Sequence, residues 1–347
     1  MGTSKFGTSK LILGIETSCD ETAAAVVADG NRVISSVVSS QIDLHSKYGG
    51  VVPEVASRAH VELMIPVINE ALIQANLDGF PNMGKTVPDA IAVTVGPGLV
   101  GSLLVGVSAA KTLAAIWGVP FIPINHLEGH LYAAFLEEPD LIQDFPLVVL
   151  LASGGHTALV EMKGHGDYIL LGETIDDAAG EAFDKVGRIL NLGYPGGPSI
   201  DKASMGANPD AIKFPRSLIK EGFDFSFSGL KTSVLNFVKK NPGFSIPDIA
   251  ASFQEAVVDV LVTKTARAID QTGAKGLCLA GGVAANSRLR EKILDICIEK
   301  NVRPFLPSPE MCTDNAAMIA AAGYWRLNEP DESLSIGVDP SMKLVTK

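Results

Sequence analysis

Two histidines four residues apart are the side chains of this sequence best suited to hold a metal ion. His126 and His130 follow Asn125, a typical helix N-cap, so we expect a helix to begin there. Residues four apart share one helix face, and two imidazoles at that spacing can bind one ion. Glu128 would lie about 200° around the helix from His126, which differs from the HExxH motif of zinc proteases. Two ordinary surface histidines remain the alternative for so short a motif.

A polar turn after the first apolar run could also carry chemistry. Residues 11–16 are typical of a buried strand, and residues 17–22 (TSCDET) form a turn before a second strand. Such a turn offers hydroxyls and backbone N–H groups to a phosphate. Asp20 and Glu21 would then hold a cation or take up a proton. A hairpin whose acids are merely solvated explains the same residues equally well.

The same layout returns later in the chain. Residues 146–160 again read as an apolar strand, a small polar turn and a second strand, and Thr157 corresponds to Thr22, 135 positions earlier. Residues 168–172 match the third strand of the first copy. We interpret this as a duplicated β-hairpin unit, in which two domains clamp a nucleotide phosphate chain in a cleft. Chance similarity of two α/β starts is the alternative.

Three glycine-rich segments precede or open helices: residues 96–102, 194–201 and 281–286. A glycine turn between a strand and a helix is an anion-binding geometry, although close packing of strand on helix explains the first segment as well. We expect Asp201 at the start of a helix, within reach of ribose hydroxyls. Asn286 suits the reading of adenine or ribose edges.

Two more acids complete the candidate set. Asp184 lies seven residues after Asp177, so the two share a helix face. Asp314 precedes an apolar helix, where it is either the N-cap, the commoner role of such an Asp, or a third metal ligand.

Composition bounds the class of protein. The 347 residues are 47% hydrophobic and only 6% aromatic, with 34 Gly, which indicates an α/β protein rich in turns. No apolar run is long enough to span a membrane, and the first ten residues predict a disordered leader without a targeting signal. Four Cys without a CxxC pair suit a reducing compartment, so we expect a cytoplasmic protein.

The formal charge of −11 repels nucleic-acid backbones on average. Binding to RNA would therefore need a local basic patch or a partner subunit. The richest stretch runs from Lys202 to Lys240, and a solvated polar surface explains it equally well.

Taken together, the motifs resemble one family, the tRNA N6-adenosine threonylcarbamoyltransferases, formerly described as O-sialoglycoprotein endopeptidases. The form of the first motif is similar to the bacterial and organellar branch. The matching segments occur in order over about residues 11–327: ETSCDET (16–22), GPGLVGSL (96–103), NHLEGH (125–130), SGGHT (153–157), DDAAGEAFDK (176–185), YPGGP (194–198), FSFSGLKT (225–232), GGVAAN (281–286) and CTDNAAMIA (312–320).

The resemblance implies an α/β fold of the actin/Hsp70/sugar-kinase (ASKHA) type, with two duplicated lobes around a nucleotide cleft. We expect the lobes at residues 11–144 and 145–312, a helix near 313–327 that packs back on the first lobe, and a tail at 328–347. The resemblance implies one divalent metal, Fe²⁺ in preference to Zn²⁺, on His126, His130 and Asp314. It implies substrate contacts from Leu151, Ala152, Ser153, Gly154, Gly155, Asp184, Gly197, Asp201 and Asn286.

The implied reaction is transfer of the threonylcarbamoyl group from threonylcarbamoyl-AMP to N6 of adenosine 37, in tRNAs that read codons beginning with A. Positioning and a cation near the carbonyl or the departing phosphate should supply most of the catalysis. Asp20 or Glu21 would accept the proton from N6. ATP or ADP could occupy the same cleft. The implied partners are tRNA, a paralogous subunit of the same fold and a small P-loop ATPase; a homodimer that acts alone is the other possibility.

Three other functions remain open on the sequence. A kinase or ATPase of the same fold would need Mg²⁺ and an acidic base rather than a fixed histidine pair. A metalloprotease would use His126 and Glu128, against the displaced position of the glutamate. A non-catalytic scaffold in an RNA-modifying complex would need none of these side chains.

Overall fold

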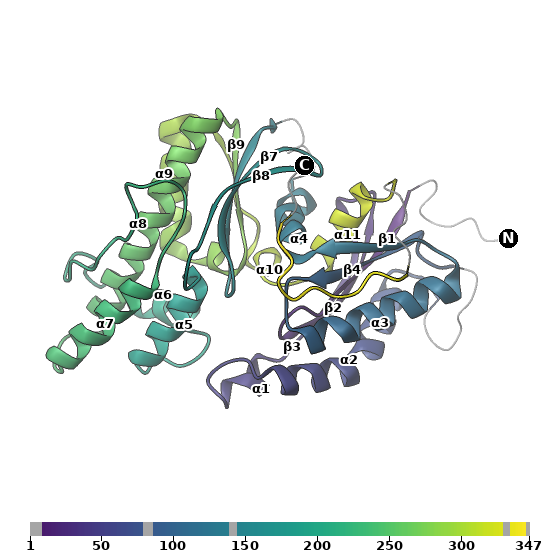
Figure 1. The fold of residues 1–347 in the computed structure, drawn as a ribbon, viewed down its shortest axis with the longest axis horizontal. Helices are drawn as coiled ribbons and strands as arrows, with labels where there is room; N and C mark the ends of the chain where they lie inside the picture. Colours follow the sequence, from purple (N-terminus) through teal and green to yellow (C-terminus); the bar gives the residue numbers. More distant parts are fainter. Residues whose placement is uncertain (1–8, 79–85, 139–143, 329–333, 345–347) are drawn as a thin grey trace. The chain divides into compact units, whose positions relative to one another are not determined.

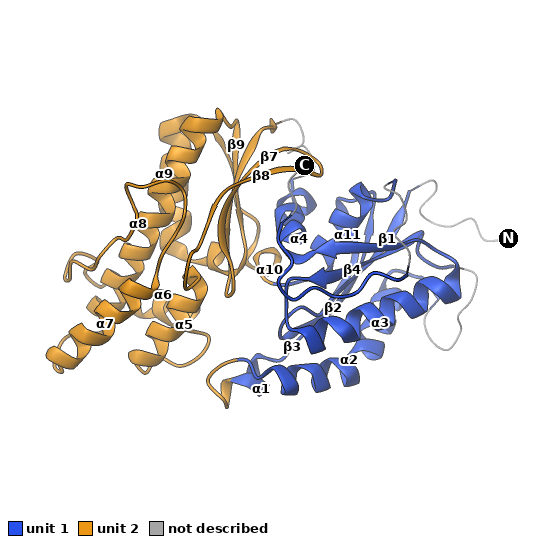
Figure 2. Ribbon diagram, viewed as in Figure 1, with its two compact units in different colours: residues 1–45, 51–139, 314–344 blue, residues 46–50, 140–313, 345–347 orange. Residues whose placement is uncertain are grey.

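Two compact units make up the chain in this computed structural model, which describes residues 9–78, 86–138, 144–328 and 334–344 (Figure 1). Unit 1 comprises residues 1–45, 51–139 and 314–344, and unit 2 comprises residues 46–50, 140–313 and 345–347 (Figure 2). Residues 1–8 of the expected leader lie outside the described residues. Lys10, at its end, pairs with Asp89 at 2.9 Å.

A five-stranded sheet forms the centre of unit 1. Its order is β3-β2-β1-β4-β5, with the hairpin strands antiparallel and β1, β4 and β5 parallel. The first strand lies at the predicted residues 11–16, and the second begins at Glu21, within the predicted turn. The strands are β1 (Leu11–Glu16), β2 (Glu21–Ala28), β3 (Arg32–Ser40), β4 (Ala90–Gly96) and β5 (Phe121–Asn125).

Helices cover both faces of this sheet. Alternate residues of β1, such as Leu13 and Ile15, pack in the core that α2 and α3 supply, while Gly14 on the other face lies directly against α11. A Cβ at Gly14 would come within 2.1 Å of the Ala316 carbonyl oxygen, so only glycine fits there. The helices of unit 1 are α1 (Ile42–Ser46), α2 (Pro53–Gln74), α3 (Val100–Trp117), α4 (His126–Tyr132), a 3-10 turn (Ala133–Leu136) and α11 (Ala316–Trp325).

Unit 2 repeats the same sheet. Its order, β8-β7-β6-β9-β10, has the strand directions of β3-β2-β1-β4-β5. Glu16 pairs with Ala23 in unit 1, and Leu151 pairs with Ala158, 135 positions later in both strands. The predicted duplication is therefore confirmed down to the hairpin register. The strands are β6 (Leu147–Ala152), β7 (Thr157–Gly164), β8 (Asp167–Glu173), β9 (Gly276–Ala280) and β10 (Arg303–Phe305).

The helices of unit 2 pack around one long central helix, α8. It begins at Ile246, because Ser245 caps it, and ends where Gly273 takes a left-handed conformation. Phe253, Val257 and Leu261 join it to the core of the unit. The helices are α5 (Ala179–Ile189), α6 (Gly196–Ser204), α7 (Ser228–Lys240), α8 (Ile246–Thr272), a 3-10 turn (Gly282–Ala285), α9 (Ser287–Lys300) and α10 (Pro309–Cys312).

The last described segment, residues 334–344, lies along unit 1. The N–H of Asp339 donates to the Val95 carbonyl at 2.8 Å, and the Pro340 carbonyl accepts from Gly98 at 3.2 Å. Ile336, Val338 and Met342 pack against the core of the unit. We call residues 334–344 the C-terminal segment.

One helix in the described parts of the chain, α3, is long and apolar enough to cross a membrane by length and composition. Leu103, Val107 and Ala110 of this helix are buried inside unit 1. That burial is typical of a core helix in an α/β unit.

Candidate functional site

The two histidines of the candidate metal centre begin α4, directly after β5. Asn125 ends the strand, and its Oδ1 accepts the N–H of Leu127 at 2.8 Å, so the predicted N-cap is confirmed. Gly129 lets α4 approach α11 closely, since a Cβ there would lie 2.5 Å from Ile319. This helix pair brings His126 and His130 next to the start of α11.

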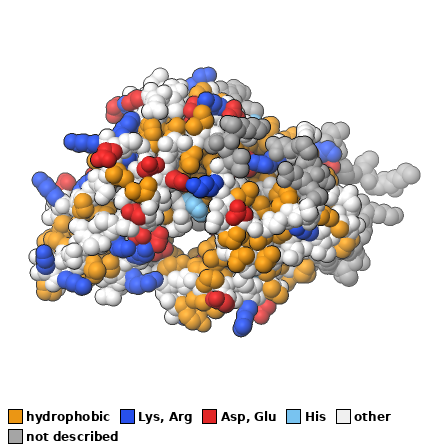
Figure 3. All heavy atoms as spheres, viewed as in Figure 1, with side chains coloured by type: hydrophobic (Ala, Val, Ile, Leu, Met, Phe, Trp, Pro, Cys, Tyr) orange, Lys and Arg blue, Asp and Glu red, His pale blue; other side chains and the backbone are white. Residues whose placement is uncertain are grey.

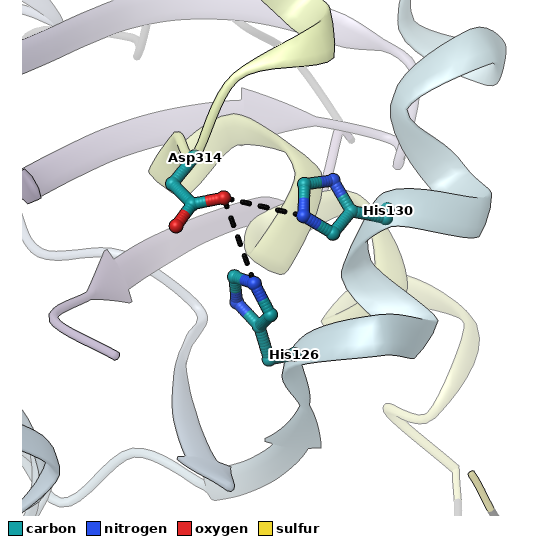
Figure 4. Close-up of side chains that lie close together, drawn as sticks. All are labelled: His126, His130 and Asp314. Carbon is teal, nitrogen blue, oxygen red and sulfur yellow. Dashed lines mark ion pairs between the residues drawn. The ribbon is translucent and has the colours of Figure 1, made fainter. Parts of the chain in front are cut away.

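Asp314 completes the group from the other end of the chain. Its Oδ1 lies 3.5 Å from Nε2 of His126 and 3.2 Å from Nε2 of His130, and the three side chains point toward one another (Figure 4). The candidate ligand atoms all lie within 4.8 Å of one another. Asn315, rather than Asp314, caps α11, because its side chain accepts the N–H of Met318 at 3.0 Å. The carboxylate of Asp314 is therefore not used as a cap.

A fully buried carboxylate behind His126 fixes the orientation of that ring. Glu16 accepts from the Thr94 hydroxyl at 2.5 Å, and its Oε2 lies 3.1 Å from Nδ1 of His126. Burial alone would lower the pKa of His126, but Asp314 and Glu16 outweigh it and raise that pKa to about 9. Burial would likewise raise the pKa of Glu16, yet His126 and Thr94 lower it. Nδ1 is thus engaged, and Nε2 is left facing Asp314.

The three side chains fit a divalent cation. Both ring nitrogens of His130 are buried, and within the described chain no hydrogen bond reaches either of them. Nε2 lies 3.2 Å from Asp314 without the geometry of a hydrogen bond, and a buried imidazole in that state is costly unless another ligand binds it. Asp314 is 21% exposed, so its side of the group opens to solvent and could admit a further ligand. Two imidazoles and one carboxylate with an open side form a donor set for iron or zinc.

Glu128, the residue that suggested a protease, forms an ion pair instead. Its carboxylate is buried and pairs with Arg326 through contacts of 3.0 and 2.8 Å. Arg326 follows α11, so the pair ties α4 to the end of that helix. Glu128 therefore has a structural partner, and this arrangement argues against its acting as the base of a metalloprotease.

Asp20 and Glu21 belong to unit 1, and Glu21 lies close enough to Asp314 to feel the charge of its carboxylate. Glu21 is the first residue of β2 rather than part of the turn, and its Oε1 accepts from the Ser40 hydroxyl at 3.2 Å. Burial, together with the carboxylates of Asp314 and Asp20, raises the pKa of Glu21 to about 10. A cation bound by Asp314 would offset the negative charge of these carboxylates and so lower the pKa of Glu21.

A buried histidine that the sequence did not single out holds this turn in place. His60 of α2 lies with Nδ1 2.7 Å from the Thr22 hydroxyl and Nε2 3.0 Å from the Cys19 carbonyl oxygen. The two contacts fix both ends of the segment that carries Asp20 and Glu21. The only sequence signal was its position on the apolar face of a helix, which is also where ordinary core histidines occur.

The glycine turn at residues 96–98 does not present free amides to an anion. The N–H of Gly98 donates to Pro340, and the N–H of Leu99 donates to the Ser18 carbonyl at 2.8 Å. A Cβ at Gly98 would lie 2.6 Å from that same Ser18 oxygen. Of the two readings of this turn, close packing is therefore the one that its contacts favour.

The expected substrate-binding residues are joined by a ring of contacts within unit 2. Ser153 accepts the N–H of Gly180 at the start of α5, and Asp184 on α5 accepts the N–H of Gly196 at 2.7 Å. Asp201, farther along the helix that begins at Gly196, bonds Asn286 at 3.3 Å. Gly281 lies against Ala152, beside Ser153, which closes the ring.

Three of the expected substrate-binding residues differ from expectation in detail. Asp201 lies in the second turn of α6 rather than at its start, because α6 begins already at Gly196. Leu151 and Ala152 are buried within β6, and Ser153 to Gly155 form the turn that follows it.

Four glycines around this ring have no packing reason to be glycine. Gly154, Gly155, Gly197 and Gly282 have space where a Cβ would stand, and none has the positive φ that favours glycine. Glycine at such positions allows a ligand to approach the backbone closely. All four belong to unit 2.

The duplicated sheets, each flanked by helices, define a protein of the actin/Hsp70/sugar-kinase class. Solved structures agree on the fold. HypF from T. kodakarensis superimposes with a TM-score of 0.63 at 17% identity, over 93% of this chain and 48% of that one. The activator of 2-hydroxyisocaproyl-CoA dehydratase from Clostridium difficile, with bound ADPNP, gives 0.53 at 13% identity, over 92% and 96%.

Sequence comparison is more specific. The family model of the tRNA N6-adenosine threonylcarbamoyltransferases (TsaD) matches residues 32–321. Proteins of that name from Carboxydothermus hydrogenoformans and Symbiobacterium thermophilum are 55% and 56% identical, covering 96% and 91% of this chain and 98% and 92% of their own. The chain belongs to the tRNA N6-adenosine threonylcarbamoyltransferase family, and it is a transferase.

Proposed function

We propose that this enzyme transfers the threonylcarbamoyl group of threonylcarbamoyl-AMP to N6 of adenosine 37 in tRNAs that read codons beginning with A. Family membership supports the activity. The observation that carries the site is the meeting of His126, His130 and Asp314, which come from distant parts of the sequence.

In this proposal the three side chains hold one divalent ion, Fe²⁺ in preference to Zn²⁺. Two histidines and one carboxylate with an open side are a donor set of ferrous sites, and catalytic zinc sites use it as well. The bound ion supplies positive charge near the carbonyl or the departing phosphate. Glu16 keeps Nε2 of His126 directed at the ion through its contact with Nδ1.

Asp20 or Glu21 would accept the proton that N6 loses after it attacks the carbonyl carbon. Glu21 could do so only with a cation bound at Asp314 that brings its pKa, about 10 without the cation, down to the working pH. Their place beside Asp314 supports this role. We expect Asp20→Ala or Glu21→Ala to lower transfer at least a hundredfold, the effect of removing a positioned base. Full activity of both variants with bound metal and adenylate would show that neither is the proton acceptor.

The AMP part of the substrate is assigned to unit 2. The open glycines would let its phosphate approach the backbone of residues 153–155, and Asp201 would accept hydrogen bonds from the ribose. The ring of contacts from Ser153 to Asn286 would keep these groups in fixed positions.

The partners in this proposal are tRNA, a paralogous subunit of the same fold and a small P-loop ATPase. Several large apolar side chains of α2 and α3 are exposed, and Figure 3 shows hydrophobic side chains gathered over these helices. This surface, which we call the α2–α3 surface, supports a protein partner; it comprises Val61, Ile65, Val100 and Leu104. A homodimer through the same surface is the alternative.

For tRNA we propose the exposed lysines between Lys202 and Lys240. Lys231 pairs with Asp177, and Arg216 pairs with Asp259, which lowers their value for phosphate binding. The remaining exposed lysines are Lys202, Lys213, Lys220, Lys239 and Lys240. Four cysteines without disulfides suit action in the cytoplasm.

The deciding experiment is a transfer assay with threonylcarbamoyl-AMP and unmodified tRNA, with and without the partner subunits, together with elemental analysis. His126→Ala and Asp314→Ala should lose both metal and transfer, while Glu70→Gln, an exposed acid of unit 1, should keep both. Sugar phosphorylation without iron or zinc would favour a kinase. Peptide cleavage lost in His126→Ala would favour a protease, and the absence of all three activities a scaffold.

A further inference from the structure

Gln254 is a buried polar residue that the proposed reaction does not yet use. It lies on α8 and is 5% exposed, in a helix whose other buried positions are mostly apolar. Its Oε1 accepts a hydrogen bond of 2.8 Å from Nδ2 of Asn286. A buried amide of this kind stabilises one arrangement of its partner over others.

The side chain of Asn286 is almost fully occupied by the protein itself. Its Oδ1 caps α9 by accepting the N–H of Leu289 at 3.0 Å. Its two N–H groups donate to Gln254 and to Oδ1 of Asp201. With both donors engaged, Asn286 acts on a ligand mainly through Asp201.

Asp201 receives three hydrogen bonds from this neighbourhood. Besides Asn286, the hydroxyl of Ser287 donates to Oδ1 at 2.7 Å, and the backbone N–H of Ser287 donates to Oδ2 at 3.2 Å. The carboxylate is half-buried, so part of it reaches solvent. A carboxylate fixed in this way can accept hydrogen bonds from vicinal hydroxyls without first losing rotamer freedom.

The helices that carry Gln254 and Asn286 are tied together beside this cluster. Arg288, in the first turn of α9, makes contacts of 2.8 and 3.0 Å with the carboxylate of Glu255, the neighbour of Gln254. Lys292 joins the same carboxylate. This ion-pair network therefore sets the distance between the side-chain amides of Gln254 and Asn286.

We propose that Gln254 and Ser287 are positioning residues that set the preference for ribose over deoxyribose, by holding the Asp201 carboxylate for the sugar hydroxyls. The inference rests on the proposed assignment of AMP to unit 2. It gives Asn286 the role of a link between Gln254 and Asp201 rather than that of a direct contact to the base.

The test is calorimetric titration of the full-length chain with AMP and with 2′-deoxy-AMP and 3′-deoxy-AMP. The parent protein should bind AMP at least tenfold more tightly than the deoxy analogue that lacks the bonded hydroxyl, the usual effect of a hydrogen bond to a charged group. Gln254→Leu should reduce that preference to less than threefold while changing the affinity for the deoxy analogue little. Ser287→Ala, at an exposed position that does not threaten folding, should reduce the preference by about threefold.

Thr265→Val is the matched control, because Thr265 is also buried on α8 but, among the described residues, its hydroxyl bonds only the Leu261 carbonyl of its own helix. It should keep the full preference. Equal loss of affinity for all three nucleotides in Gln254→Leu, or an unchanged preference in both variants, would overturn the inference.

Asp201→Ala separates this inference from the proposed site. If the ribose preference vanishes in Asp201→Ala but persists in Gln254→Leu and Ser287→Ala, only the positioning role is wrong. If Asp201→Ala binds AMP as the parent does, or the parent shows no preference, the assignment of the ribose to Asp201 is wrong and the inference fails with it.

Discussion

Asp314 and Asn315 are neighbours in the chain, and either could cap a helix. In the structure Asn315 caps α11, and Asp314 faces the two histidines. The sequence left this choice open because both side chains accept hydrogen bonds from the first turn of a helix. Only the approach of α4 to α11 decides it, and that contact depends on packing far from both residues in the sequence.

Glu16 gives a prediction for the proposed metal site. Glu16→Gln removes the carboxylate charge that lies beside Nδ1 of His126. It should weaken metal binding by about 10–100-fold, the usual effect of losing a residue that orients a metal ligand. The metal dissociation constant, measured by competition with a chelator, checks this. Glu70→Gln should bind metal as the parent does, and a folded Glu16→Gln chain with parental affinity would contradict the role.

The sequence did carry a sign of Glu16. A charged residue ends an otherwise apolar strand, and such a residue is buried only with partners. Which partners these are could not be read from the sequence, because Thr94 and His126 come from β4 and from the start of α4. The sequence did not single out His60 and Gln254 for the same reason, because a polar residue on a helix does not indicate which residues contact it.

The C-terminal segment is linked to α4 through Asn125. While Oδ1 of Asn125 caps α4, its Nδ2 donates to the Lys343 carbonyl at 2.9 Å. The sequence predicted the cap but assigned residues 328–347 only as a tail, because an irregular segment has no periodicity to reveal its contacts.

Asn125→Asp distinguishes the contribution of the cap bond to Leu127 from that of the bond to Lys343. It keeps the cap but replaces the donor to Lys343 with a carboxylate oxygen, so the free energy of unfolding should fall by about 1 kcal/mol and amide exchange in residues 336–343 should speed up. Hydrogen exchange with mass spectrometry measures both. Removal of a cap in unit 2, in Ser245→Ala, should leave exchange of this segment unchanged. Slow exchange in Asn125→Asp would mean that the bond to Lys343 contributes little.

The ion-pair network between α8 and α9 predicts a loss of stability in acid. Burial alone would raise the pKa of Glu255, but Arg288 and Lys292 outweigh it and lower that pKa to about 2. Since the folded pKa lies below the unfolded value of about 4.3, the stabilisation is complete above that value and disappears as the pH falls toward 2. Glu255→Gln should cost on the order of 1 kcal/mol at pH 7, after screening by solvent, and progressively less below pH 4.

Urea unfolding at several pH values checks this prediction. Glu291→Gln is the control, because Glu291 also contacts Arg288 but its side chain is 60% exposed. It should change stability by only a few tenths of a kcal/mol at any pH. A Glu255→Gln deficit as large at pH 3 as at pH 7 would contradict the pKa shift.

For the molecule as a whole, the duplication was the most predictable feature. An offset of 135 residues between Thr22 and Thr157 predicted two equivalent hairpins, and the register of both sheets follows it. Hairpins are local, so their pattern survives in the sequence. The parallel strands β4 and β5 join the first sheet, and β9 and β10 the second, only after long connections. The local sequence pattern does not determine the order of such strands.

The α2–α3 surface predicts how the chain assembles. Leu104→Glu or Ile65→Glu, at side chains that are half exposed, should weaken association with a paralogous subunit or a second copy at least tenfold without a loss of folding. Sedimentation velocity measures this. Ile298→Glu, at an exposed position of α9 in unit 2, is the control and should associate normally. Parental association of all three variants would exclude this surface as the interface.

Unit 1 is built from chain segments that a ribosome makes at different times. His126 and His130 are synthesised before nearly all of unit 2, and Asp314 is synthesised after nearly all of it. Between the synthesis of His130 and that of Asp314, a nascent chain therefore carries the two imidazoles without the carboxylate. In the proposed metal site, all three ligands are therefore present together only near the end of translation, and chains that terminate before Asp314 lack one of them.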